Sequence, residues 1–231
     1  MSIKITWLGH SAFIVELDGH MLLFDPFLTG NPLAARSADE IETELILLSH
    51  AHGDHLGDTI PIAQRTGAPV VCNADMAGWI KKHGAPTVHG QNSGGGANYG
   101  WCHVRQTIAH HSSMFPDGSY GGNPNGFVVT GKVSGMRLYY AGDTALFSDM
   151  KLIGEERIDV AFLPIGDYFT MGPADAVKAV KLINPRYVVP MHYNTFDLIA
   201  VDVADWASRV STETNAAPIV IDPGGSFSVT E

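Results

Sequence analysis

Cysteine is scarce in this sequence. The 231 residues include only two, Cys72 and Cys102, and they lie far apart in the chain. So few cysteines exclude a disulfide framework and favour a reducing compartment, so we expect a cytoplasmic protein. The first residues contain no long apolar segment, so no signal peptide is expected. No apolar run approaches the ~20 residues that a membrane-spanning helix requires, so no membrane association is expected either.

Positive charge is also scarce. The chain carries 14 Lys and Arg against 24 Asp and Glu, a formal net charge of −10. Non-specific binding to nucleic acid needs a basic surface, so long nucleic acids are not expected as partners. A small anionic ligand remains compatible with this balance, because bound metal ions supply positive charge locally. The sequence leaves a homo-oligomer open.

Length and patterning indicate a packed α/β (α+β) fold. With 45% hydrophobic and 16% charged residues, the chain can bury a full core, and we expect one domain over residues 1–231. Alternating and apolar runs predict strands at 3–7, 12–17, 21–24, 45–48, 69–72, 103–109, 127–130, 136–141, 158–164, 187–189, 219–221 and 226–229. Helical spacing predicts helices at 56–65, 74–83, 173–183 and 202–210. Strands that come first in pairs and then alternate with helices favour two packed sheets with helices outside.

Two glycine-rich segments are expected to be irregular. Residues 93–96 read Ser-Gly-Gly-Gly, but neither a strand before them nor a helix after them is evident. A phosphate-binding loop needs both, so a plain turn is predicted. Residues 114–126 form a long loop rich in Gly, Pro and Asn, and such loops in compact domains are often functional.

The sequence His50-Ala51-His52-Gly53-Asp54-His55 carries the strongest chemical signal. It follows the apolar run 45–48, which predicts a tight loop at the carboxyl end of a buried strand, where open sheets place their sites. Three imidazoles and a carboxylate within six positions argue against an ordinary exposed loop. These nitrogen and oxygen donors suit zinc, manganese, iron or nickel.

Three further metal-type side chains follow predicted strands. They are His111, Asp143 and His192. Taken alone, His192 could be a buried, hydrogen-bonded histidine and Asp143 a turn residue in Gly-Asp-Thr. Because strand ends at one edge of a sheet can converge, these residues and the histidine cluster together predict one metal centre.

These motifs resemble those of the metallo-β-lactamase superfamily. The pattern His50-x-His52-x-Asp54-His55, a later His, Gly-Asp-Thr and a C-terminal His occurs in the same order. Shorter segments resemble a family of metal-dependent hydrolases related to the ascorbate-6-phosphate lactonases; they are Trp7-Leu8-Gly9-His10-Ser11, His111-Ser112-Ser113, Gly122-Asn123-Pro124, Ala141-Gly142-Asp143-Thr144-Ala145, Leu163-Pro164-Ile165-Gly166-Asp167 and Pro190-Met191-His192-Tyr193. The resemblance implies a four-layer αββα sandwich.

The resemblance also implies two metal ions. Its ligand pattern assigns His50, His52 and His111 to the first ion and Asp54, His55 and His192 to the second, with Asp143 bridging both. Zinc is the first choice of metal, with manganese, nickel or iron as alternatives. His110 adjoins His111 and would be either a hydrogen-bond partner of the site or simply exposed, because neighbours on a strand face opposite ways.

The implied chemistry is hydrolysis of a small-molecule substrate. Two divalent ions ~3.5–4 Å apart can share one water and lower its pKa towards ~7, which yields a bridging hydroxide at neutral pH. A small ester, lactone or phosphodiester is the expected substrate, and Asp54 is the candidate catalytic residue that orients the nucleophile and moves its proton. A mononuclear iron oxygenase, an RNA- or nucleotide-processing enzyme of the same fold, and a non-catalytic metal-binding protein remain alternatives.

Several residues carry weaker predictions. His10, Asn123, Asn125 and Asp167 are candidate substrate contacts, and Thr170 lies near the same expected edge. Asp25 ends a predicted strand and is a candidate hydrogen-bond partner of a ligand imidazole, which would fix its tautomer. A structural role is the alternative for His10, and a turn carboxylate before Pro26 is the alternative for Asp25.

Overall fold

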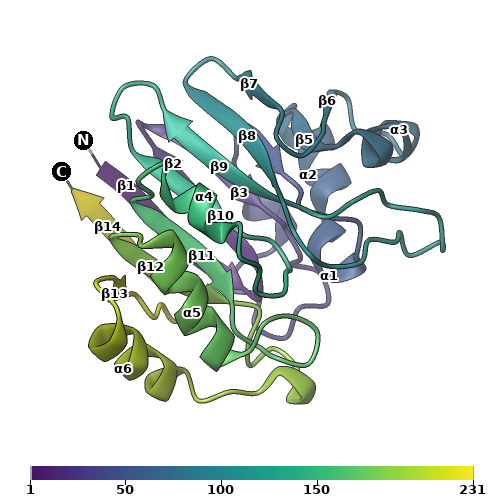
Figure 1. Ribbon diagram of the computed structural model, residues 1–231. Helices are drawn as coiled ribbons and strands as arrows, with labels where there is room; N and C mark the ends of the chain where they lie inside the picture. Colours follow the sequence, from purple (N-terminus) through teal and green to yellow (C-terminus); the bar gives the residue numbers. More distant parts are fainter. Residues whose placement is uncertain (1, 231) are drawn as a thin grey trace.

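Two β-sheets pack face to face, and helices cover their outer faces (Figure 1). The computed structural model describes residues 2–230, and within them each sheet has seven strands. The strand orders are β14-β1-β2-β3-β4-β5-β6 and β13-β12-β11-β10-β9-β8-β7. The expected αββα sandwich of an α/β fold is thus confirmed.

The first sheet combines an antiparallel and a parallel half. Its strands are β1 (Ser2–Gly9), β2 (Ala12–Leu17), β3 (His20–Phe24), β4 (Leu45–Leu47), β5 (Val70–Asn73), β6 (Val88–Gln91) and β14 (Ser226–Thr230). Strands β14, β1, β2 and β3 pair antiparallel, whereas β3 to β6 pair parallel. Ser2 on β1 pairs with Thr230 on β14, so the two ends of the described chain are neighbours.

The second sheet repeats this arrangement. Its strands are β7 (Gly96–Asn98), β8 (Cys102–Ile108), β9 (Asn125–Gly131), β10 (Arg137–Tyr140), β11 (Val160–Pro164), β12 (Tyr187–Met191) and β13 (Ala217–Pro218). Strands β7 to β10 pair antiparallel, and β10 to β13 pair parallel. Parallel neighbours end at the same edge, so the residues that follow them are brought together.

The helices lie on the outer faces, and the core fills the space between the layers. The α-helices are α1 (Gly53–Leu56), α2 (Thr59–Thr66), α3 (Ala74–Lys82), α4 (Met150–Gly154), α5 (Pro173–Ile183) and α6 (Val203–Glu213), with short 3₁₀ turns η1 (Ala38–Glu40) and η2 (Asp197–Ile199). Between the sheets, the Phe24 and Tyr140 rings stack with centroids 4.5 Å apart. Phe13 meets Phe162 edge-on at 4.9 Å. Within residues 2–230, no helix combines the length and the apolar character needed to cross a membrane.

The structure corrects several predicted elements. The expected helix at 56–65 is two helices, and α1 already includes Asp54 and His55, so the histidine cluster is part helix and not a plain loop. The predicted strand 219–221 is absent, because the chain leaves the sheet after β13. Gly96, expected in a turn, begins β7, and β6 and α4 were not predicted. These missed elements are short, and β6 and β7 lie at or beside sheet edges.

Candidate metal centre

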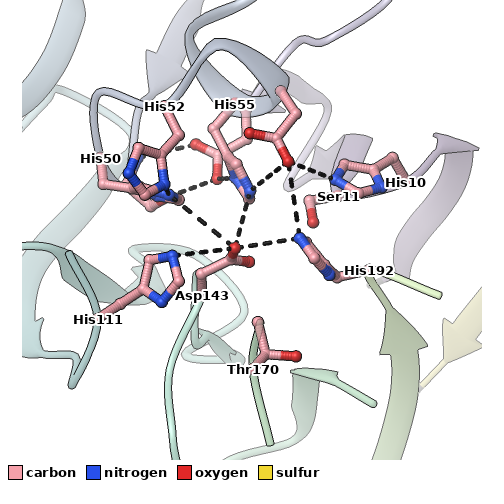
Figure 2. A network of polar contacts seen from close by, with 12 residues as sticks. His10, Ser11, His50, His52, His55, His111, Asp143, Thr170 and His192 are labelled. Atoms are coloured by element: carbon pink, nitrogen blue, oxygen red, sulfur yellow. Dashed lines mark hydrogen bonds and ion pairs between the residues drawn. The ribbon is translucent and has the colours of Figure 1, made fainter. Parts of the chain in front are cut away.

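The metal-type side chains named from the sequence meet at one edge of the sandwich (Figure 2). Each follows the carboxyl end of a strand; they are His10 after β1, Asp25 after β3, the 50–55 cluster after β4, His111 after β8, Asp143 after β10 and His192 after β12. Both sheets therefore contribute to the centre.

Local backbone geometry turns these residues inwards. His52 caps α1, and its carbonyl oxygen accepts hydrogen bonds from the amides of His55 at 3.0 Å and Leu56 at 2.8 Å. This single turn brings Asp54 and His55 back towards His50. His10 and His192 adopt left-handed conformations with φ of 57° and 54°. Such strained non-glycine backbone tends to occur at functional sites.

The Asp143 carboxylate lies at the middle of the centre. Its Oδ2 is 3.1 Å from Nε2 of His192, 3.3 Å from Nε2 of His55, 3.6 Å from Nε2 of His111 and 4.0 Å from Nε2 of His50. Figure 2 shows these imidazoles pointing towards Asp143 from different directions.

Two groups of donor atoms surround this carboxylate. His50, His52 and His111 form one group, and His10, Asp54, His55 and His192 form the other; within each group one donor atom per residue lies within 4.8 Å of all the others. Asp143 Oδ2 contacts both groups, since His111 belongs to the first and His192 to the second. The structure thus shows two adjacent clusters that could each hold a cation.

The electrostatics of the centre favour bound cations. Burial disfavours charge on Asp143, but the imidazoles of His192 and His55 outweigh it and hold the pKa of Asp143 well below its usual value. Burial likewise opposes protonation of His192, but Asp143 and Asp54 raise the pKa of His192 to about 9. The pKa of His55 is raised in the same way, whereas burial lowers that of His50. The buried carboxylates thus keep His192 and His55 protonated in the absence of metal, and a bound cation can replace those protons.

Unsatisfied polar atoms support the same conclusion. Nε2 of His55 and Oδ1 of Asp143 are buried and make no hydrogen bond within residues 2–230. A buried polar atom without a partner is costly, and such atoms need an explanation. A metal ion held between them would provide one, so the residues present fit a divalent cation.

Asp25 anchors two of the ligand candidates from behind. Its Oδ2 lies 2.7 Å from Nδ1 of His55 and accepts a hydrogen bond of 2.5 Å from the Ser49 hydroxyl. That hydroxyl oxygen is in turn 2.9 Å from Nδ1 of His50. If each Nδ1 donates, both imidazoles present Nε2 to the centre. The Tyr140 hydroxyl, from the opposite sheet, lies 2.8 Å from the same Asp25 oxygen.

A cavity opens over the two clusters. It has a volume of about 400 Å³ and is lined by His52, Asp54, His111, Ser112, Asp143, Phe169 and His192. Asp54 is 34% exposed, so its carboxylate reaches this cavity, whereas Asp143 is only 3% exposed. A volume of this size suits a small molecule.

The weaker candidates fall in different places. Asn123 is exposed and lines a neighbouring cavity of about 370 Å³ together with His110 and His111. Asn125 is buried, and its amide nitrogen donates to Ser93 Oγ and to the carbonyl of Thr107, which favours a structural role.

The remaining candidates differ in their exposure to solvent. His10 is completely buried beside Asp54, so it has no exposed surface to offer a substrate. His110 is exposed, with its ring 5.0 Å from that of Phe147. Asp167 is exposed in a turn, where its carbonyl accepts a hydrogen bond from the amide of Thr170 at 2.9 Å.

Four residues of the site were not identified from the sequence. Ser49 and Tyr140 hold Asp25, Thr195 lies 2.8 Å from Nδ1 of His10, and Phe169 lines the cavity. Ser49 directly precedes the histidine cluster, and that position was the one available signal. The others depend on how distant segments pack.

Comparisons with known proteins place the chain in one family. The model of a family described as the beta-lactamase superfamily domain matches residues 4–192. A UPF0173 metal-dependent hydrolase of Pelotomaculum thermopropionicum is 45% identical over 229 residues, which is 97% of this chain and 99% of the relative. Another from Thermus thermophilus is 49% identical over 209 residues, covering 90% and 91% of the two chains. The solved structure of Igni18, a metallo hydrolase from Ignicoccus hospitalis, is 36% identical, covers 100% of both chains and superposes with a TM-score of 0.91.

Proposed function

Since the chain belongs to the beta-lactamase superfamily and is a metal-dependent hydrolase, we propose that it holds two divalent cations. We further propose that it cleaves a small ester, lactone or phosphodiester. The observation that carries this proposal is the position of Asp143. Its Oδ2 lies within 4.0 Å of imidazole nitrogens from both donor groups. One carboxylate placed between two clusters is suited to bridge two ions.

The ligand assignment follows the two groups. His50, His52 and His111 would hold the first cation, and Asp54, His55 and His192 the second, with Asp143 shared. When bound, two such cations would acidify a water at neutral pH and act as a Lewis acid on the electrophile. We propose zinc as the first choice, with manganese, nickel and iron as alternatives, because imidazole and carboxylate donors accept all four.

The chain's own residues position the reaction. Asp25 and Ser49 hold Nδ1 of His55 and His50, so that both imidazoles keep one orientation. Asp54 lines the cavity, and the imidazole of His55 is among the groups that hold its pKa below the usual value. We assign Asp54 to orient the nucleophile and to pass its proton to the leaving group.

The cavity limits the substrate to a small molecule. Its volume is about 400 Å³, and the apolar ring of Phe169 lines it together with the polar donors. Five neutral imidazoles and two carboxylates would leave two divalent ions with a positive surplus, which attracts an anionic group. We therefore expect a small, preferentially anionic substrate, acted on in the cytoplasm.

The test joins metal analysis to a substrate screen. Elemental analysis of the metal-loaded protein should find two ions per chain. Chelation followed by reloading should abolish and then restore turnover of one member of a panel of lactones, phosphodiesters and esters. Asp143→Asn should lose both turnover and at least one ion. Turnover that survives complete chelation would contradict the proposal. A single iron ion with substrate-dependent oxygen uptake would favour an oxygenase instead.

A further inference from the structure

His10 lies inside the centre but has no place in the ligand set above. It is completely buried, and its Nε2 is 3.2 Å from Oδ2 of Asp54. We infer that His10 is a further ligand of the second cation, which it binds through Nε2 together with Asp54, His55, His192 and the shared Asp143. This inference rests on the proposed two-cation centre and extends it.

Hydrogen bonding on the far side of the ring leaves Nε2 free to bind a metal. Nδ1 of His10 lies 2.8 Å from Thr195 Oγ1, and that hydroxyl donates to the carbonyl of Tyr193 at 3.4 Å. With the hydroxyl proton used in this way, Nδ1–H donates to Thr195, and Nε2 keeps its lone pair. His55 with Asp25 and His50 with Ser49 show the same arrangement, which is the usual one for metal-binding histidines.

The separations at Nε2 suit atoms that share an ion. Two donor atoms each ~2.1 Å from one cation and at right angles lie ~3.0 Å apart, and opposite donors lie ~4.2 Å apart. Asp54 Oδ2 is 3.2 Å from Nε2 of His10, 3.7 Å from that of His192 and 4.0 Å from that of His55. A lone pair on Nε2 facing a carboxylate oxygen is repulsive unless a cation lies between them.

The backbone and the surrounding rings fix His10 in this orientation. Its carbonyl accepts hydrogen bonds from Trp7 Nε1 at 2.9 Å and from the amide of His192 at 3.1 Å, which hold the left-handed backbone with φ of 57°. Phe27 and Phe196 meet its ring edge-on, at 5.8 and 5.7 Å. The imidazole is therefore preorganised and cannot swing out to meet a substrate.

The additional ligand would make the two metal sites unequal. The first has three imidazoles and a share of Asp143, a set suited to four-coordinate zinc. The second would have three imidazoles and two carboxylates, which leaves one position for water in an octahedral shell. Octahedral coordination with mixed nitrogen and oxygen donors favours manganese, iron or nickel over zinc.

The experiment is a titration of the chelated protein with Mn²⁺, in which calorimetry measures the heat of each binding event. His10→Gln keeps an amide N–H at about the reach of Nε2, so it can still hydrogen-bond Asp54 but is a poor ligand. We expect His10→Gln to weaken binding of the second ion at least ~100-fold, which exceeds the effect of losing a residue that only hydrogen-bonds a ligand. The affinity for the first ion should change by less than about threefold. The matched control is His20→Gln. His20 begins β3, at the end of that strand away from the metal centre, so this variant should bind both Mn²⁺ ions as the wild type does.

Other results would overturn the inference. If His10→Gln binds both ions as the wild type does, His10 only orients Asp54, while the two-cation proposal stands. If the wild type itself binds no second ion, the proposed function fails first. Anomalous diffraction from Mn²⁺-soaked wild-type crystals provides a test that does not depend on the variant folding. An ion peak within bonding distance of Nε2 supports the assignment, and a second-site peak at any longer distance refutes it.

Discussion

Nδ1 of His55 lies 2.7 Å from Oδ2 of Asp25, and both side chains are fully buried. The same carboxylate reaches His50 through the Ser49 hydroxyl. His55 and His50 are assigned to different cations. One buried acid therefore orients a ligand of each ion, and a change at Asp25 should affect both sites.

Replacing Asp25 by Asn should weaken both metal sites. The amide cannot accept all the hydrogen bonds that the carboxylate accepts, so the tautomers of His55 and His50 are no longer fixed. Loss of such an outer partner reduces metal affinity ~10–100-fold, and the buried mismatch costs ~2 kcal/mol of stability. Calorimetric metal titration and thermal unfolding measure the two effects.

Asp18→Asn is the matched control for this change. Asp18 also has a left-handed backbone, with φ of 54°, and accepts backbone hydrogen bonds from Val133 and Ser134. It follows β2 at the other end of the sheet, so its replacement should leave metal affinity unchanged. If Asp25→Asn binds both ions normally, the orienting role of Asp25 is wrong.

His111 and its neighbour His110 should differ sharply on replacement by Ala. Nε2 of His111 faces Asp143 at 3.6 Å, whereas His110 is exposed beside Phe147. His111→Ala should lose one ion per chain and nearly all turnover, and His110→Ala should keep both ions. Elemental analysis of the two variants checks this, and the opposite ranking would show that the other histidine is the ligand.

Phe169 should contribute to substrate binding but not to metal binding. Its ring lines the cavity and is 52% exposed. Phe169→Ala should raise KM roughly tenfold, as expected for losing ~1.4 kcal/mol of apolar contact, with unchanged metal content. Tyr168→Ala is the control, since Tyr168 is 69% exposed and does not line the cavity. Equal KM values for the two variants would remove Phe169 from the binding site.

The metal-free protein should lose stability as the pH rises. Asp143 and Asp54 outweigh burial and raise the pKa of His192 from 6.5 to about 9. A group whose pKa is raised by folding stabilises the folded state fully below its unfolded pKa, and that contribution is lost as the pH rises through the folded value. The chelated protein should therefore melt at lower temperature at pH 9 than at pH 6.5, by ~5 °C for ~2 kcal/mol.

Two comparisons isolate this effect. His192→Gln should weaken the dependence between pH 6.5 and 9, because it removes one of the two buried imidazoles whose pKa folding raises, the other being His55. The metal-loaded protein should lack it, since a coordinated imidazole is already deprotonated. A melting temperature of the chelated wild type that rises over this range would contradict the assignment.

The ligand candidates could be identified from the sequence because most of the metal-binding side chains lie close together in the chain. Six residues, 50–55, contain four of them, and His111, Asp143 and His192 each follow a readable strand. Parallel strand ends converge at one edge of a sheet, so the grouping of ligands within each sheet could be predicted, whereas the meeting of the two groups depends on how the sheets pack. The structure brings all seven within one centre.

The supporting contacts were not accessible in this way. Tyr140 and Asp25 lie 115 positions apart, and their contact depends on how one sheet rests on the other. For His10 the sequence leaves a substrate contact and a structural role open, because a histidine at a strand end has no readable direction; the structure buries it against Asp54 and Thr195. The strand expected at 219–221 failed because the last backbone bond to β12 is made by Ile219, after which the chain turns away.

The antiparallel pairing of β1 with β14 has a consequence for engineering. Ser2 lies opposite Thr230, at the far end of β1 from Gly9 and the metal centre. Joining the termini with a short peptide would close the backbone into a ring without disturbing a single ligand candidate. New termini could then be opened at an exposed turn at the far end of β9 and β10, such as the one at Val133, which would yield a permuted enzyme with its metal-binding edge intact.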